Sequence, residues 1–319
     1  MAMIASLKAG ERLQSVLDPA SGAAALMHEL GIVLYIGAAV ILTLVLALAL
    51  YGAFSRPREI SARTWVIGGG VIFPTLVLTA LLIYEIHIGN ALSAGAPRPA
   101  EIEVTGKLWW WEIRYGNGNP GGAGLQAVLA NELYIPVGRP VEIALRTDNV
   151  IHSFWVPALA GKVDMIPGRV NRLVLEARAP GVYRGQCAEY CGMQHAWMAF
   201  YVVAVPEEAY RLWLAGQAAP ARATTDPFLL RGREAFLREG CGTCHTIRGT
   251  PADGALGPDL THVGSRRSLA AGRLDNHTGT LAGWIADSQR IKPGNLMPSI
   301  NTLSGEDLRA VAAYLESLK

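Results

Sequence analysis

Charged residues are scarce in this chain, and their two signs nearly balance. Only 17% of the 319 residues are Asp, Glu, Lys or Arg, and the formal net charge is +2. No stripe of Lys and Arg with interleaved aromatic residues occurs, which argues against a nucleic-acid-binding protein. The glycine-rich segment Asn117–Gly124 lacks the G-x-x-x-x-G-K pattern, so the sequence predicts no phosphate-binding loop there.

Cysteine is also scarce. The four cysteines form two close pairs, Cys187 with Cys191 and Cys241 with Cys244, and none is left over. Such spacing does not predict a disulfide framework. A Cys187–Cys191 disulfide in an oxidising compartment is the alternative, but the neighbours of this pair are themselves metal-ligand types. The pattern therefore favours two cofactor sites.

Apolar sequence, in contrast, is abundant. Hydrophobic residues make up 51% of the chain, which is high for a soluble protein. Leu30–Phe54 and Trp65–Tyr84 contain no charged residue and are long enough to cross a bilayer. Buried helices of a soluble core are the alternative, but these usually carry roughly 10 to 14 apolar residues. The sequence predicts a transmembrane helical hairpin over residues 29–88.

The link between the two apolar stretches is basic. It contains Arg56, Arg58 and Arg63, and short loops rich in Lys and Arg usually face the cytoplasm. Residues 1–28 and everything after the hairpin are then expected on the outer side. The first thirty residues do not show the ordered parts of a signal peptide. Glu85 lies near the outer end of the second stretch, where a proton-path role and simple interfacial placement both remain open.

Beyond Gly89 the sequence changes to short segments of alternating apolar and polar residues, separated by Gly, Pro and Asn. This period of two is typical of strands with one buried face. The pattern predicts an all-β sandwich or barrel over residues 96–214. Its expected strands are Glu101–Thr105, Leu108–Tyr115, Glu132–Pro136, Val141–Leu145, Val170–Glu176 and Ala199–Val205.

A third composition follows a stretch rich in Ala, Pro and Thr, residues 215–226, which is typical of a linker. Phe228–Glu239 and Gly305–Leu318 are expected to be helical, the latter with Glu306 and Asp307 near its start, where the helix dipole favours acidic residues. Residues 227–319 are therefore predicted to form a compact all-α domain. A domain of this size usually needs a cofactor or a covalent cross-link for stability.

Four soft metal ligands lie within twelve residues: Cys187, Cys191, His195 and Met198. Thiolate, thioether and imidazole together select copper, whereas structural zinc uses Cys and His without Met, and hard cations prefer oxygen. His152 offers a second imidazole upstream. The residues themselves predict a copper site.

The segment Cys187–Met198 resembles subunit II of cytochrome c oxidase, in which a cupredoxin-like Greek-key domain holds the dinuclear CuA centre. His152–Pro157 and Asp164–Arg169 resemble two further segments of that family. The resemblance implies that the thiolates of Cys187 and Cys191 bridge two coppers. The imidazole of His152 and the thioether of Met198 would complete the ligands of one copper. The imidazole of His195 and the backbone carbonyl of Glu189 would complete those of the other.

The same resemblance implies further roles. The Glu189 carboxylate would ligate a magnesium ion shared with subunit I, although a lone Glu in a loop is usually only solvated. Trp109 would be the point where electrons arrive from cytochrome c, with core packing as the alternative. Since adjacent strand residues point to opposite faces, at least one of Trp109, Trp110 and Trp111 should be exposed or lie under a loop. The family also has a glutamate near the outer end of its second span, at a proton channel of the partner subunit, as Glu85 would be.

Cys241-Gly-Thr-Cys244-His245 is a C-x-x-C-H motif, which predicts haem c bound through two thioethers, with His245 as an axial ligand. A zinc site that also uses His262 and His277 is the alternative. Segments around Met297 and at Gly257–Leu260 resemble the distal and intermediate loops of class I cytochromes c, which implies Met297 as the sixth ligand. The competitors for that position are His262 and His277. Met/His ligation leaves no vacant position and favours electron transfer.

These features predict a non-catalytic electron-transfer subunit of a haem-copper oxidase in a bacterial inner membrane, with its N-terminus, copper and haem on the periplasmic side. Electrons would pass from a donor cytochrome c or bc-type complex through haem c and CuA to subunit I, where oxygen reduction to water is coupled to proton translocation. Subunits I and III and membrane lipid are the expected partners. The CuA subunit of a nitric or nitrous oxide reductase and a free-standing membrane redox shuttle are the alternatives.

Overall fold

The computed structural model describes residues 11–12, 14–55, 61–93, 100–116 and 127–319. The chain divides into two compact units, which are considered separately. Residues 22–97 form one, and residues 1–21 together with 98–319 form the other. Arg56, Arg58 and the glycine-rich segment 117–124 lie outside the described residues.

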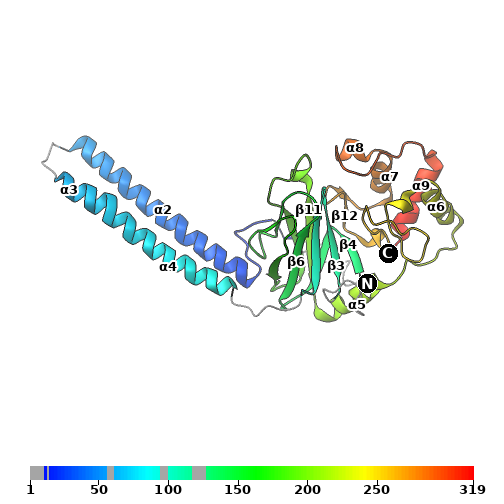
Figure 1. The fold of residues 1–319 in the computed structure, drawn as a ribbon, viewed down its shortest axis with the longest axis horizontal. Coiled ribbons are helices and arrows are strands. Elements are labelled where there is room, and N and C mark those ends of the chain that lie inside the picture. Colours follow the sequence, from blue (N-terminus) through cyan, green and yellow to red (C-terminus); the bar gives the residue numbers. More distant parts are fainter. Residues whose placement is uncertain (1–10, 13, 56–60, 94–99, 117–126) are drawn as a thin grey trace. The chain divides into compact units, whose positions relative to one another are not determined.

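The smaller unit consists of long apolar helices (Figure 1). The first is α2 (Gly22–Phe54), and the second runs through α3 (Ala62–Thr64), the π-helix η2 (Trp65–Ile72) and α4 (Phe73–Ser93). Both are long and apolar enough to cross a membrane. Two apolar helices were expected, but the first begins at Gly22 rather than Leu30, and the second continues well beyond Tyr84.

The β domain, residues 102–205, is a sandwich of two mixed sheets (Figure 1). The first sheet has the order β4-β3-β2-β6-β9 and consists of β2 (Ile102–Lys107), β3 (Trp110–Tyr115), β4 (Ala127–Ala130), β6 (Val141–Thr147) and β9 (Asn171–Leu175). The second has the order β5-β11-β10-β7-β8 and consists of β5 (Glu132–Pro136), β7 (His152–Trp155), β8 (Val163–Met165), β10 (Gly181–Cys187) and β11 (Ala199–Val205). The predicted all-β architecture is confirmed.

Aromatic side chains join the two sheets in the core. Trp111, Phe154 and Phe200 are almost completely buried. The rings of Trp111 and Phe154 meet edge to face with their centroids 5.8 Å apart, and those of Phe154 and Phe200 lie 4.6 Å apart. Such contacts add to the stabilisation from apolar burial. They also set the positions of β7, which begins at the candidate ligand His152, and of β11, which directly follows the candidate ligand Met198.

The segment before α2 contributes to this sandwich. Its strand β1 (Glu11–Arg12) pairs in parallel with β10, and the backbone N–H of Ala20 donates to the carbonyl of Ala158 at 2.7 Å. The carbonyl of Ala20 in turn accepts from the N–H of Arg178. Part of the predicted N-terminal segment 1–28 is therefore a strand of the β domain.

Helix α5 (Glu207–Ala218) follows the last strand and packs on the sandwich. Its Trp213 stacks on Tyr134 of β5, with the ring centroids 4.0 Å apart. The predicted linker 215–226 thus begins inside a helix. The chain then lies along the next domain, where the Arg248 guanidinium donates to the carbonyls of Gln217 at 2.6 Å and Ala218 at 3.1 Å.

The helical domain, residues 227–319, contains α6 (Pro227–Arg238), α7 (Thr278–Ala286), α8 (Ser288–Ile291) and α9 (Gly305–Ser317). Short elements connect them: η4 (Cys241–Thr243), η5 (Val263–Ser265), and the hairpin of β12 (Ser268–Leu269) and β13 (Leu274–Asp275). Asp226 caps α6 and Ser304 caps α9, both by accepting backbone N–H groups. The helices α6 and α9 cross so closely at Gly232 that a Cβ there would collide with the carbonyl of Ala310.

Candidate copper and haem sites

Two buried thiols form the centre of the first site. Cys187 ends β10 and Cys191 lies in the loop that follows, with their Sγ atoms 3.7 Å apart and both thiols free. The hydrogen bond between the two thiols lowers the pKa of Cys187 and raises that of Cys191. The pair therefore stabilises one thiolate internally, and a bound cation would favour loss of the second proton.

Four further ligand atoms surround this pair. His152 Nδ1 lies 3.7 Å and the carbonyl oxygen of Glu189 3.2 Å from the Sγ of Cys187. His195 Nδ1 lies 3.6 Å and Met198 Sδ 3.9 Å from the Sγ of Cys191. The fold thus brings together all six predicted ligands, two from the ends of strands and four from the loop between β10 and β11. The donor set of two thiolates, two imidazoles, a thioether and a carbonyl suits copper.

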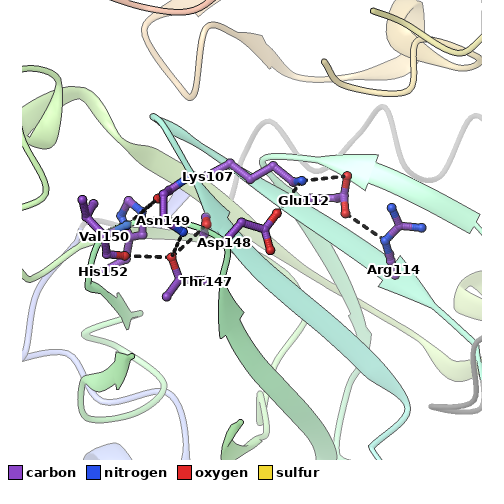
Figure 2. Close-up of polar contacts among 9 residues, drawn as sticks. Lys107, Glu112, Arg114, Thr147, Asp148, Asn149, Val150 and His152 are labelled. Atoms are coloured by element: carbon purple, nitrogen blue, oxygen red, sulfur yellow. Dashed lines mark hydrogen bonds and ion pairs between the residues drawn. The ribbon is translucent and has the colours of Figure 1, made fainter. Parts of the chain in front are cut away.

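Asn149 orients the buried imidazole of His152, as Figure 2 shows. The Oδ1 of Asn149 lies 3.1 Å from His152 Nε2, so donation from Nε2 leaves Nδ1 free of a proton and able to bind metal. Thr147 supports this turn by donating to the carbonyl of Val150 at 2.7 Å. Sequence reasoning missed Asn149, although a polar side chain three residues before a candidate ligand is a usable signal.

Strand β2 supports the same turn from the other side. The Nζ of Lys107 lies 2.8 Å from Asp148 and 3.9 Å from Glu112 (Figure 2). Its neighbour Gly106 packs on the ring of His152, where a Cβ would lie 2.8 Å from the ring Cδ2. Only glycine fits there without moving the imidazole.

Two other predicted positions are exposed. The Glu189 carboxylate is 43% accessible and lies 4.0 Å from the Nζ of Lys162, while its carbonyl faces the sulfur pair. Glu85 is exposed on α4. The magnesium role of the first and the proton-path role of the second remain expectations.

A cavity of about 550 Å³ occupies the helical domain and is lined by Cys241, Cys244, His245 and Met297. Its volume and largely apolar walls suit a bound organic cofactor. The Nδ1 of His245 donates to the carbonyl of Pro258 at 2.8 Å, which leaves Nε2 as the ligand atom. Burial lowers the pKa of His245, so the imidazole stays neutral as metal ligation requires.

The two competing histidines have other partners. His262 lies with its Nε2 3.0 Å from the carbonyl of Ala219, and His277 caps α7 by accepting the N–H groups of Gly279 and Thr280. Neither residue lines the cavity. Met297 does, which makes it the better candidate for the second axial ligand.

The three consecutive tryptophans differ in their surroundings. Trp111 is fully buried, and its indole N–H donates to the carbonyl of Met198 at 3.3 Å. Trp109 and Trp110 are half-buried and line the haem-sized cavity from the side of the β domain. The indole N–H of Trp109 also donates to the carbonyl of Cys191 at 2.7 Å. One side chain therefore touches the wall of the cavity and the backbone of a copper ligand.

Glu132 forms a second buried connection between the β and helical domains. Its carboxylate accepts the backbone N–H groups of Arg267 and Ser268 from the helical domain. Burial raises the pKa of Glu132 from 4.5 to about 7, against the opposing effect of these N–H groups and of the Arg266 and Arg267 charges. The carboxyl group is thus expected to titrate near neutral pH.

Replacing Glu132 by glutamine is expected to flatten the pH dependence of thermal unfolding. The raised pKa means that the carboxyl group stabilises the native state most below pH 4.5, and that this contribution is lost as pH rises through about 7. The full shift corresponds to at most about 3 kcal/mol in the free energy of unfolding. Melting temperatures of the holoprotein between pH 5 and 8 would test this, with the exposed Glu208→Gln as a control that retains the wild-type slope.

Two protein families match the chain. Residues 101–205 match cytochrome c oxidase subunit II, periplasmic domain, and residues 229–319 match cytochrome c. A crystal structure of the periplasmic domain of subunit II of cytochrome oxidase from Bradyrhizobium japonicum is 29% identical, with a TM-score of 0.34, and covers 39% of this chain and 96% of that one.

Relatives match over much of their length. Cytochrome c oxidase subunit 2 of Alkalihalophilus pseudofirmus is 37% identical over 269 residues, or 82% of this chain and 76% of that protein. Cytochrome c oxidase subunit 2 of a Bacillus species is 32% identical over 229 residues, or 68% of this chain and 62% of that protein. The chain belongs to the cytochrome c oxidase subunit 2 family, with a cytochrome c domain after the periplasmic domain of that family.

Proposed function

We propose that this chain relays electrons from a haem c in its helical domain to a dinuclear copper centre in its β domain, and from there to subunit I of a haem-copper oxidase. The observation that carries the proposal is the position of Trp109. Trp109 is one of the residues that line the cavity, and its indole N–H donates to the carbonyl of Cys191. The two sites are thereby connected through one aromatic ring and one hydrogen bond.

The chain's residues would hold the two groups as follows. Cys241, Cys244, His245 and Met297 would hold the haem. Cys187, Cys191, His152, His195, Met198 and the carbonyl of Glu189 would hold the copper. When bound, the haem would supply a one-electron donor and the copper pair a one-electron acceptor, so that the relay would require no bond to be made or broken.

The residues present would fill both sites with protein ligands, and this supports a relay rather than a catalytic role. Oxygen reduction to water, with its coupled proton translocation, would take place in subunit I. Subunit III and membrane lipid complete the expected surroundings, in a bacterial inner membrane with the copper and haem sites on the periplasmic side. A donor cytochrome c or bc-type complex would reduce the haem. Glu189 would bind magnesium at the contact with subunit I, and Glu85 would lie at a proton-channel opening there.

Replacing Trp109 by phenylalanine tests the relay. The variant keeps an aromatic ring in the cavity wall but loses the N–H that donates to Cys191, so we expect electron transfer from haem to copper to slow by about tenfold or more, equivalent to roughly 1.4 kcal/mol in its barrier. Flash-induced reduction of the haem, followed by absorbance of haem and copper, gives this rate directly.

Trp110→Phe is the matched control, because Trp110 is also half-buried at the cavity wall but, within the described residues, donates no hydrogen bond to a proposed copper ligand. Its rate should equal that of the wild type. Equal rates in all three proteins would remove Trp109 from the electron path.

A further inference from the structure

Lys292 is a buried lysine that the ligand sets do not use. It follows α8, and only 3% of the residue is exposed. Lysine is rarely buried, because its ammonium group loses hydration unless hydrogen bonds replace it. Here Nζ donates to the carbonyls of Trp109 at 2.7 Å, Trp197 at 3.0 Å and Ala270 at 3.3 Å. The three donors of the ammonium group therefore meet three acceptors.

These acceptors come from three separate parts of the fold. Trp109 lies between β2 and β3, and its side chain lines the haem-sized cavity. Trp197 lies in the copper-ligand loop, between His195 and Met198. Ala270 lies in the turn between β12 and β13 of the helical domain. One ammonium group of the helical domain thus binds both the tryptophan next to the cavity and the loop that carries the copper ligands.

Neighbouring contacts hold the same surfaces together. The Nε2 of Gln194, in the copper-ligand loop, donates to the carbonyl of Pro293 at 2.6 Å. The guanidinium of Arg273 lies 4.0 Å from the ring centroid of Trp197, within the range of a cation–π contact. The contact of Lys292 is therefore part of an interface with several specific polar interactions.

Lys292 is also connected to the proposed axial ligand. The amide of Asn295 donates from Nδ2 to the carbonyl of Lys292 at 2.7 Å and accepts at Oδ1 from the N–H of Met297 at 2.8 Å. The side chain of Asn295 thus joins the two ends of the loop from Lys292 to Met297. A displacement of Lys292 would be passed to Met297.

We propose that Lys292 is a positioning residue that fixes the cytochrome c domain in one docked orientation, with the Met297 loop held against Trp109 and the copper-ligand loop. A buried charge is weak evidence for added stability, and in some proteins it instead selects one arrangement. If the domain moved freely on its linker, Lys292 would lose its hydrogen bonds to the carbonyls of Trp109 and Trp197 in the β domain. Only the carbonyl of Ala270, in its own domain, would remain as an acceptor. The inference rests on the proposed relay from haem to copper.

Pulsed EPR on the fully loaded, oxidised chain measures the distribution of distances between the copper centre and the ferric haem. We expect one narrow distribution in the wild type and a broadened one in Lys292→Met, which keeps an unbranched side chain, one heavy atom shorter, but none of its donors. Lys292→Gln keeps two donors without the charge and should lie between them. The matched control is Lys319→Met, an exposed lysine of the same domain.

The rate of electron transfer from haem to copper provides the second readout, with a loss of about tenfold or more expected in Lys292→Met and none in Lys319→Met. A narrow distribution in Lys292→Met would overturn the proposal, and so would a broad one with an unchanged rate. Absence of any haem-to-copper transfer in the wild type would instead reject the relay itself. The distance distributions would still show whether Lys292 fixes the docked orientation.

Discussion

Replacing Cys191 by serine is expected to abolish the dinuclear copper centre. Cys191 is within 4 Å of the Sγ of Cys187, the Nδ1 of His195 and the Sδ of Met198, so its loss removes a ligand from both proposed metal positions. A serine hydroxyl is a harder ligand and does not ionise near neutral pH, so it cannot bridge two coppers as a thiolate does. We expect the copper content to fall from two per chain and the mixed-valence EPR signal to disappear.

Met193→Leu is the matched control for the copper site. Met193 lies in the same loop, but its side chain is 69% exposed and it is not among the ligands. This variant should keep both coppers and an unchanged EPR spectrum. Two coppers and a normal spectrum in Cys191→Ser would reject the bridging assignment, whereas loss of copper in both variants would indicate a general sensitivity of the loop.

Replacing Met297 by alanine is expected to open the haem iron to carbon monoxide. Met297 lines the cavity together with His245, and its backbone is fixed by Asn295, Ser288 and Gln289. Alanine would keep these backbone bonds but remove the thioether, leaving a coordination position vacant. We expect the reduced variant to form a carbon monoxide complex visible in its absorption spectrum, and the wild type to form none. The midpoint potential should also fall, because Met/His ligation raises it.

His277→Asn and His262→Gln are the matched controls for the axial position. Asparagine can still cap α7, and glutamine can still donate to the carbonyl of Ala219, so each variant removes an imidazole while keeping its structural contact. Both should resist carbon monoxide as the wild type does. If Met297→Ala resists it too and one of the histidine variants does not, the axial role belongs to that histidine.

Alternation of apolar and polar residues predicted part of the β domain well. The predicted bounds of β5 and β11 agree with the structure at both ends. Strands β4, β7, β8 and β10 were not predicted. β4, β7 and β8 are short, and β10 contains Gly185, which leaves room for the ring of Phe200 where alternation would demand a side chain.

Ligand types could be predicted from sequence because they lie close together in the chain. The copper motif spans twelve residues and the haem motif five, so their chemistry is visible without a fold. The connection between the sites was not predictable in this way. Trp109 and Cys191 are 82 residues apart in the sequence, and Trp109 and Lys292 are 183 residues apart. No local sequence pattern predicts contacts over such separations.

The N-terminal strand and α5 were missed for a different reason. Two residues are enough to form β1 when a sheet edge is already present, and so short a segment has no detectable periodicity. In α5, the apolar residues that pack on the sandwich include Tyr210 and Trp213, which are also common in strands. Tertiary contacts rather than local preference decide both elements.

The contact between the linker and the cytochrome c domain affects how the rate of electron supply would depend on the concentration of the outside electron donor. Arg248 binds the end of α5 through the carbonyls of Gln217 and Ala218, which shortens the free length of the tether. A short tether keeps the effective concentration of one domain near the other in the millimolar range. Under the proposed relay, the encounter of haem and copper would be independent of dilution. Only the reduction of the haem by an outside donor would depend on donor concentration and on ionic strength.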